Sequence, residues 1–275
     1  MKYLKNKYLH YISEILEVIR KPVVSVLPGH LSFFLLLSSI PIILIFGIIA
    51  STFSISFNRL SDFIVSSLPA NTSKLIIPLF HTEMSGVGVI ILVISALFLA
   101  SRVTKAIILT ANNIYDVKKS GIRDMIKSVF ITFLIIMVFV FMIIVLLLGD
   151  KILALINNIE GINFISKNLM KFIEILKWPV SLFVIFFSLK FIYILTPNKK
   201  IPSKTVNKGS LFTTIGWMLI TFIYSFYVTN YASYNDYYGS ASNLVILMLW
   251  VFLISQIFVI GMIINSIEDK NYKNE

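Results

Sequence analysis

Long apolar runs are the feature that most constrains how this chain can fold. Residues 128–149, for example, contain no charged residue and consist almost entirely of Ile, Val, Leu, Phe and Met. An apolar stretch of about 20 residues is long enough to cross the hydrocarbon core of a bilayer as a helix. Several such runs occur, and only 13% of the 275 residues are charged, whereas soluble domains carry about 25%. The sequence therefore predicts a polytopic membrane protein.

The spacing of these runs predicts an all-α transmembrane helical bundle of about six spans, forming a single integral membrane domain over residues 1–275. The expected spans are residues 31–53, 86–101, 128–149, 175–195, 209–231 and 244–267. Residues 54–84 and 150–174 contain apolar segments too short to span. These two regions are expected to be interfacial or re-entrant, and the pattern leaves both options open.

The second span is expected to continue past Ser101 as an amphipathic helix. Its apolar stripe, at three- and four-residue spacing, comprises Val103, Ala106, Ile107, Thr110, Ala111 and Ile114. The opposite, polar face is expected to hold Arg102, Lys105, Asn112, Asn113 and Asp116. Such a helix could meet lipid headgroups on one side and protein on the other. The alternative is that its charges only mark the cytoplasmic end of a span.

Residues 1–21 are predicted to form an interfacial amphipathic helix that Pro22 ends. Its expected apolar stripe is Leu4, Tyr8, Tyr11, Ile12, Ile15 and Ile19. Its basic residues, which can face anionic headgroups, are Lys2, Lys5, Lys7, Arg20 and Lys21.

Lys and Arg are distributed unequally between the two sides that six spans define. The N-terminus, residues 102–127, residues 199–208 and the C-terminal tail hold 17 of them, and the opposite loops hold 6. Cytoplasmic loops carry the excess of basic residues, so both termini are predicted to be cytoplasmic. The net charge of +11 is thereby explained without nucleic acid as a partner.

Four blocks of sequence resemble the YihY/BrkB family of bacterial inner-membrane proteins, over roughly residues 20–267. The blocks are Leu27–Pro41 (LPGHLSFFLLLSSIP); Ala100–Arg102 through Asn113–Tyr115; Tyr193–Lys200 followed by Gly209, Trp217 and Tyr224; and Tyr238, Gly239, Trp250, Gly261 and Asn265. The resemblance implies six spans and a place in the inner membrane. Relatives have been linked to envelope properties such as serum resistance, and some have carried a ribonuclease label.

An enzyme is not predicted. The three histidines, His10, His30 and His81, lie in separate segments, and Asp116 with Asp124 is a loose pair in a basic loop. Metal-dependent hydrolysis needs clustered carboxylates or histidines, and the absence of Cys excludes thiolate ligands and nucleophiles. We therefore predict no catalytic residue, no metal site and no cofactor.

Transport of an envelope lipid or an amphiphilic anion is the favoured hypothesis, with membrane lipids as partners. Arg102 and Lys105 are expected to bind a phosphate headgroup, since a guanidinium can hold two phosphate oxygens. The further candidate substrate-binding residues, expected to line a groove between helices, are Ser38, Ser39, Ser101, Asn113 and Gln256.

Each candidate has a structural alternative. The serines could bond to carbonyls of their own helices, and Gln256 could bridge two helices. Lys190 is expected to extend to the membrane surface, and Asn265 is expected to cap the end of the last helix.

A second class of function uses the same amphipathic surfaces without transport. In that case the protein would be an assembly or scaffold factor that binds other proteins of the envelope. The sequence leaves the substrate, the energy source and the oligomeric state open.

Overall fold

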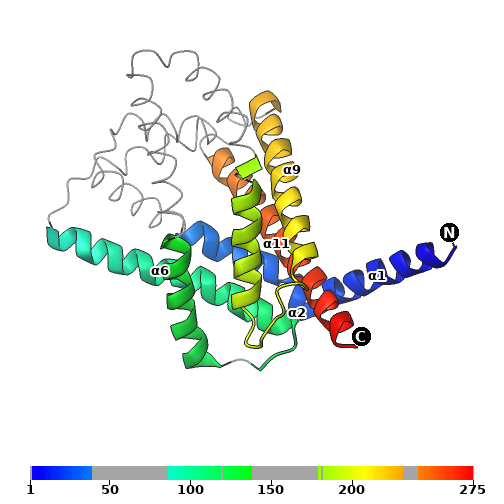
Figure 1. The fold of residues 1–275 in the computed structure, drawn as a ribbon. Coiled ribbons are helices and arrows are strands. Elements are labelled where there is room, and N and C mark those ends of the chain that lie inside the picture. Colours follow the sequence, from blue (N-terminus) through cyan, green and yellow to red (C-terminus); the bar gives the residue numbers. More distant parts are fainter. Residues whose placement is uncertain are drawn as a thin grey trace, which may run out of the picture.

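The computed structural model describes residues 2–38, 86–118, 120–137, 179–180, 182–231 and 241–274, and all regular structure within these ranges is helical. The prediction of an all-α fold is therefore confirmed for this part of the chain (Figure 1). Ser39, most of the predicted spans 31–53 and 128–149, and the predicted interfacial or re-entrant segments 54–84 and 150–174 lie outside the described residues.

The labelled helices are α1 (Lys2–Arg20), α2 (Pro22–Ser25), α6 (Gly86–Ile114), α9 (Asn207–Tyr231) and α11 (Ala241–Asn274). Further helices cover residues 27–38, residues 121–137 and Leu182–Leu195. Within the described residues, two stretches are long and apolar enough to cross a membrane, Asn207–Tyr227 of α9 and Val245–Lys273 of α11. A third is added if Tyr11–Arg20 and Pro22–Ser38 count as one bent span. The count of six spans stays a prediction.

Helices α9 and α11 lie side by side because glycines remove the side chains that would separate them (Figure 1). A Cβ at Gly209 would overlap the backbone oxygen of Gly261, and a Cβ at Gly216 would lie 2.6 Å from Ile257 Cγ2. In lipid, where helices gain little from the hydrophobic effect, small residues at the contact let the backbones approach and increase their van der Waals contact.

The helix Leu182–Leu195 joins this pair through one buried tyrosine. The hydroxyl of Tyr193 lies 2.8 Å from Thr213 Oγ1 on α9 and donates to the carbonyl oxygen of Phe258 on α11, also at 2.8 Å. The ring of Tyr193 stacks on that of Phe258 with centroids 4.8 Å apart. A single buried side chain therefore ties three helices together, and its hydroxyl finds its hydrogen-bond partners within the protein.

Helix α6 continues unbroken from the second predicted span to Ile114, as the sequence predicts. Val103, Ala106, Thr110, Ala111 and Ile114 are all buried, which confirms most of the predicted stripe.

Asn112 is a correction to the predicted polar face of α6. It is only 1% exposed, and its side-chain oxygen Oδ1 accepts a hydrogen bond from the backbone N–H of Asn198. Thr104 is also buried, and its hydroxyl pairs with that of Thr132 on the helix 121–137 at 2.7 Å. Other parts of the protein therefore contact a wider face of α6 than the predicted apolar stripe.

The C-terminal end of α6 closes with a Schellman turn. The backbone N–H of Val117 donates to the carbonyl oxygen of Asn112 at 2.8 Å, and Asp116 has a φ of 52°. Glycine usually occupies this left-handed position, and aspartate is one of the few residues that tolerate it.

Replacing Asp116 with glycine should therefore stabilise the fold. We expect Asp116→Gly to raise the free energy of unfolding by up to about 1 kcal/mol, since an L-residue in the left-handed region is strained. Thermal unfolding in detergent measures this, with Asp116→Val as the opposite control because a β-branched residue fits the position worst. A melting temperature for Asp116→Gly at or below that of the wild type would contradict the prediction.

The chain bends sharply at Pro22. Helix α1 ends at Arg20, as predicted, and Pro22 opens α2, where its missing N–H has no helical partner to lose. The axes of Tyr11–Arg20 and Pro22–Ser38 differ by 79°. Helix α1 then packs against α11 and presents Tyr11, Ile15, Val18 and Ile19 to the hydrophobic core.

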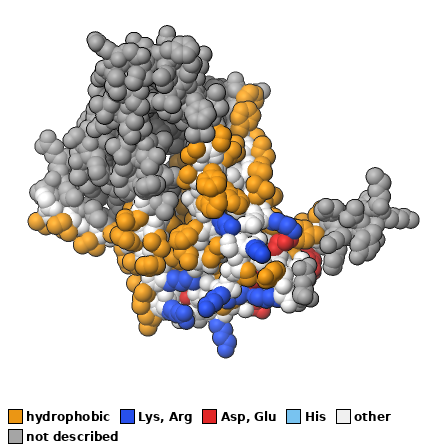
Figure 2. Space-filling model, viewed as in Figure 1, with side chains coloured by type: hydrophobic (Ala, Val, Ile, Leu, Met, Phe, Trp, Pro, Cys, Tyr) orange, Lys and Arg blue, Asp and Glu red, His pale blue; other side chains and the backbone are white. Residues whose placement is uncertain are grey.

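The basic segments lie together at one end of the molecule. Lys199 and Lys208 bond to residues near the C-terminal end of α11, and Lys127 bonds to the loop after Leu182–Leu195. Figure 2 shows Lys and Arg gathered at this end, with hydrophobic side chains above them. The segments that the count of Lys and Arg assigned to one side are thus side by side, and a cytoplasmic location for that side stays a prediction.

Candidate functional site

One stripe of α6 is apolar and exposed over several turns and then becomes basic. Val87, Ile91, Ile94 and Phe98 follow one another at three- and four-residue spacing, and their side chains are 69%, 63%, 62% and 46% exposed. The same stripe continues to Arg102, which is also exposed. From Ile91 to Arg102 the helix rises about 16 Å, close to half of the ~30 Å hydrocarbon core.

The guanidinium of Arg102 is positioned by the last apolar residue of this stripe. Its Cζ lies 4.6 Å from the centroid of the Phe98 ring, a cation–π arrangement that leaves the edge of the guanidinium available for hydrogen bonds. Lys105, half-buried, is the next residue of the same stripe toward the basic end. We call Val87, Ile91, Ile94, Phe98, Arg102 and Lys105 the α6 stripe.

Two of the predicted serines bond to their own helices. The buried hydroxyl of Ser38 donates to the carbonyl oxygen of Leu35 at 3.2 Å, and that of Ser101 donates to the carbonyl oxygen of Phe98 at 2.7 Å. Hydrogen bonds of this kind, to carbonyls of the same helix, are what the structural alternative to substrate binding predicts for these serines. Asn113, near the end of α6, and Gln256, on α11, are both half-buried. Substrate binding by these residues stays a prediction.

A partly buried polar cluster at the basic end was not predicted from the sequence. It centres on Asn198, in the short loop that follows the helix Leu182–Leu195. The backbone N–H of Asn198 donates to Asn112 Oδ1 of α6 at 2.8 Å, and its Nδ2 donates to Asp124 Oδ1 at 2.6 Å. Asp124 is fully buried, and its other oxygen accepts from the backbone N–H of Ser120 at 3.0 Å.

Lys127 binds the same loop from the next turn of the helix 121–137. Its ammonium donates to the carbonyl oxygens of Thr196 and Pro197, each at 2.9 Å, and to Asn198 Oδ1 at 3.0 Å. Burial lowers the pKa of Lys127, while the nearby Asp124 raises it. We call Asn112, Asp124, Lys127 and Asn198 the loop clamp, because their bonds fix the 196–198 loop between two helices.

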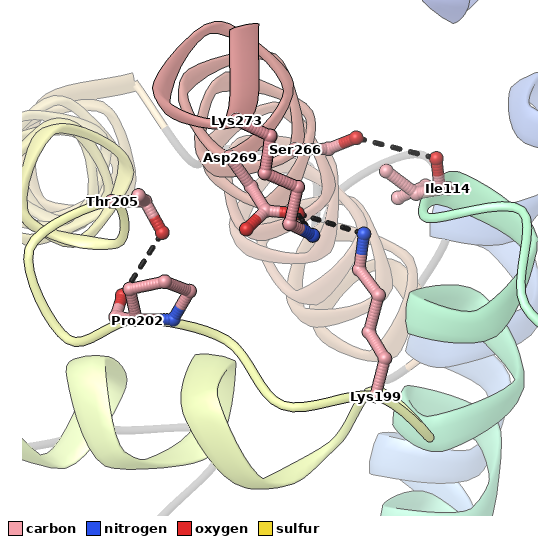
Figure 3. A network of polar contacts seen from close by, with 7 residues as sticks. All are labelled: Ile114, Lys199, Pro202, Thr205, Ser266, Asp269 and Lys273. Atoms are coloured by element: carbon pink, nitrogen blue, oxygen red, sulfur yellow. Dashed lines mark hydrogen bonds and ion pairs between the residues drawn. The ribbon is translucent and has the colours of Figure 1, made fainter. Parts of the chain in front are cut away.

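A second set of polar contacts joins Lys199, the residue after the 196–198 loop, to α11 (Figure 3). The fully buried Asp269 accepts from Lys199 at 2.8 Å and from Lys273 at 2.9 Å. The ammonium of Lys199 also lies 4.6 Å from the centroid of the Tyr115 ring at the end of α6. Burial, with a smaller effect of Asp269, raises the pKa of the Tyr115 hydroxyl, so this hydroxyl stays neutral.

Asn265 corrects a prediction. It does not cap the end of its own helix, because α11 continues to Asn274. Instead, Asn265 Oδ1 accepts from the backbone N–H of Gly209 at 2.8 Å, in the first turn of α9. The first turn of any helix has N–H groups without partners in that helix. Asn265 therefore caps the neighbouring helix α9.

The loop clamp had little local signal in the sequence. Asp124 was recognised only as part of a loose pair in a basic loop. Its partner Asn198 lies 74 residues away, and Asn112 and Asn198 are 86 residues apart, so no short spacing links them. The one available signal was the block Thr196–Lys200, a polar turn directly after an apolar helix, which the family resemblance had already singled out.

Within the described ranges, no group of three or more His, Asp or Glu side chains could hold a metal ion. His30 packs edge-on against the Phe34 ring, with centroids 5.0 Å apart. Lys190 has its ammonium 5.9 Å from the centroid of the Phe187 ring. Each of these two side chains thus contacts an aromatic ring of its own helix.

A family model described as Virulence factor BrkB matches residues 15–275. A Bacillus subtilis protein named "Putative ribonuclease-like protein YfkH" is 30% identical over 252 residues, covering 89% of this chain and 90% of that protein. A UPF0761 membrane protein of Pseudoalteromonas atlantica is 26% identical over 249 residues, 86% of this chain and 79% of the relative. One from Aggregatibacter aphrophilus is 28% identical over 240 residues, 81% and 79% of the two chains. No solved structure matches this chain.

Proposed function

Because this chain belongs to the BrkB virulence-factor family, in which several relatives are named as membrane proteins, we propose that it moves an anionic amphiphile, such as a phospholipid, between the leaflets of the bacterial inner membrane. Arg102 and Lys105 bind the phosphate of the headgroup, and the apolar part of the α6 stripe lies along an acyl chain.

The α6 stripe is the observation that carries this proposal. Its apolar residues are exposed rather than packed, and they end at an exposed arginine. An amphiphile has the same order of apolar chain and charged head. A single helix face thus offers contacts to both parts of the ligand, and Phe98 holds the guanidinium at the boundary between them.

Hydrolysis of RNA is less well supported, although one relative carries a ribonuclease-like name. A metal-dependent nuclease needs several metal-binding side chains together, and the described residues offer no such group. A non-transporting assembly role in the cell envelope remains the competing function, and it is distinguished by the experiment below.

The test is lipid translocation in proteoliposomes that contain headgroup-labelled lipids and receive an external quencher. Wild-type protein should expose the label of inner-leaflet lipids faster than protein-free vesicles do, with anionic lipid faster than zwitterionic lipid. A hydrogen bond to a charged group is worth about 1.5–3 kcal/mol, so Arg102→Ala should slow anionic lipid about tenfold or more. Arg102→Lys should retain part of the rate, because it keeps the charge and loses the planar fork.

Arg123→Ala is the matched control, since Arg123 is also exposed at the basic end but lies on the helix 121–137. Its rate should equal that of the wild type. Equal slowing by both Ala variants would show that Arg102 acts only through the overall positive charge of the surface and not by binding the headgroup. If the wild-type rate equals that of protein-free vesicles, lipid translocation is wrong and the assembly role takes its place.

A further inference from the structure

Helix α1 carries a second apolar face that the protein itself does not cover. Leu9, Ile12 and Leu16, at three- and four-residue spacing, are 55%, 52% and 46% exposed. They are distinct from Tyr11, Ile15, Val18 and Ile19, which pack against the hydrophobic core. Of the apolar stripe predicted from the sequence, Tyr11, Ile15 and Ile19 thus face the protein and Ile12 is exposed, while the side chains of Leu4 and Tyr8 lie outside the described part of the chain.

The exposed surface of α1 also has a polar sector. Glu17 and Arg20 are exposed, and at 3.6 residues per turn they lie on the side of the helix away from the packed residues. The helix therefore has three sectors, one against protein, one apolar and exposed, and one polar. This order suits a helix at a membrane surface, with protein beside it, lipid below it and water above it.

The bend at Pro22 gives α1 the corresponding orientation. The 79° angle between Tyr11–Arg20 and Pro22–Ser38 places α1 close to the membrane plane if the second helix enters the bilayer along its normal. Along that second helix, Phe33 and Leu37 are 60% and 48% exposed, as expected of a helix in contact with lipid. Val23 and Val26, 56% and 63% exposed, continue the apolar surface around the bend.

Basic residues beside this apolar surface indicate that it binds an anionic membrane. Arg20 and Lys21 are exposed at the bend, and basic residues next to an apolar helix face are attracted to anionic headgroups. We infer that α1 is a membrane-surface anchor whose Leu9, Ile12 and Leu16 side chains insert into the headgroup and acyl boundary of an anionic leaflet. This contact is independent of the α6 stripe and does not require lipid translocation.

The chain contains no cysteine, so a single introduced cysteine gives a unique position for a spin label. Ile12→Cys and Glu17→Cys are compared in full-length protein reconstituted into phosphatidylglycerol-containing vesicles. Collisions of the label with oxygen, which partitions into lipid, and with a water-soluble nickel chelate measure its surroundings. Both substitutions are at exposed positions, and Glu17→Cys is the matched control on the polar sector of the same helix.

The label at residue 12 should collide mainly with oxygen and the label at residue 17 mainly with nickel. Vesicles of phosphatidylcholine alone should lower the ratio of oxygen to nickel collisions at residue 12, as should Arg20→Gln combined with Lys21→Gln. Equal nickel accessibility at both positions, or no dependence on the anionic lipid, would overturn the inference. Protection from both reagents together with spin–spin broadening would assign this face to a second copy of the chain and overturn it as well.

The same label separates this inference from the proposed function. With Arg102→Ala present, the label at residue 12 should remain immersed in lipid even though translocation is slowed. If Arg102→Ala instead exposes residue 12 to the nickel chelate, the two surfaces are not independent and the anchor as described here is wrong.

Discussion

Gly261→Ala should severely destabilise the protein, because three helices meet at this glycine. A Cβ at residue 261 would overlap Thr213 Oγ1 on α9, lie 2.7 Å from the hydroxyl of Tyr193, and lie 2.9 Å from the backbone oxygen of Gly209. The backbone oxygen cannot move without shifting α9, and moving the Tyr193 hydroxyl would break its bonds to Thr213 and Phe258. We expect a loss of about 3 kcal/mol in the free energy of unfolding, at the upper end of overpacking effects.

Thermal unfolding of the purified protein in detergent measures this loss. Gly29→Ala is the matched control, because a Cβ at Gly29 would meet no atom within 4 Å. Gly29 lies in the helix 27–38, where alanine is favoured over glycine by up to about 1 kcal/mol, so this variant should melt at or above the wild-type temperature. Equal melting temperatures for the two variants would show that α9 and α11 are not held as closely as described.

Asp124→Ala should have an effect of similar size in the loop clamp. The substitution removes the acceptor of Asn198 Nδ2 and of the Ser120 N–H, and it removes the negative charge nearest to Lys127. Groups that are left buried without a partner cost about 1–3 kcal/mol each, and an uncompensated buried charge costs about 3–5 kcal/mol. Because Lys127 is only half-buried, we expect a total loss of about 3 kcal/mol.

The control compares Asp124, in the helix 121–137, with Asp116, in the turn after α6. Asp124→Asn keeps the size of the side chain and removes its charge, and it should cost less than Asp124→Ala but remain clearly destabilising. Asp116→Asn makes the same chemical change at an exposed position, where asparagine also tolerates the left-handed backbone, and should be close to neutral. Unfolding curves in detergent decide the matter, and equal effects of Asn at the two positions would refute the loop clamp.

Much of the secondary structure could be predicted because it depends on local patterns. Long apolar runs predicted α9, α11 and the first part of α6, apolar periodicity predicted α1 and the rest of α6, and Pro22 marked the end of α1. The α6 stripe also follows from sequence, since Arg102 and Lys105 lie on the same helix as their apolar neighbours and helical geometry alone fixes their common face.

The polar contacts at the basic end could not be predicted in the same way. Asp116 and Asp124 are the same residue type eight positions apart, in a segment predicted as one basic loop, yet one is exposed in the turn after α6 and the other is fully buried in the helix 121–137. The difference arises from Asn198, which reaches Asp124 from 74 residues away. Likewise, Asn265 looked like a local cap and proved to cap α9, because the glycine that brings α9 close lies 56 residues before it.

The sequence alone determined that this is a membrane protein of the BrkB family, that the regions of α1, α6, α9 and α11 are helical, and which segments carry its excess of basic residues. Hydropathy and charge are properties of short stretches of sequence, and they determine directly which stretches insert into the bilayer and which stay outside it. The tertiary structure alone decided which polar residues are buried and which apolar face of α1 stays exposed. Both depend on partners distant in the chain, because a polar side chain is buried at low cost only where another segment supplies its hydrogen bonds.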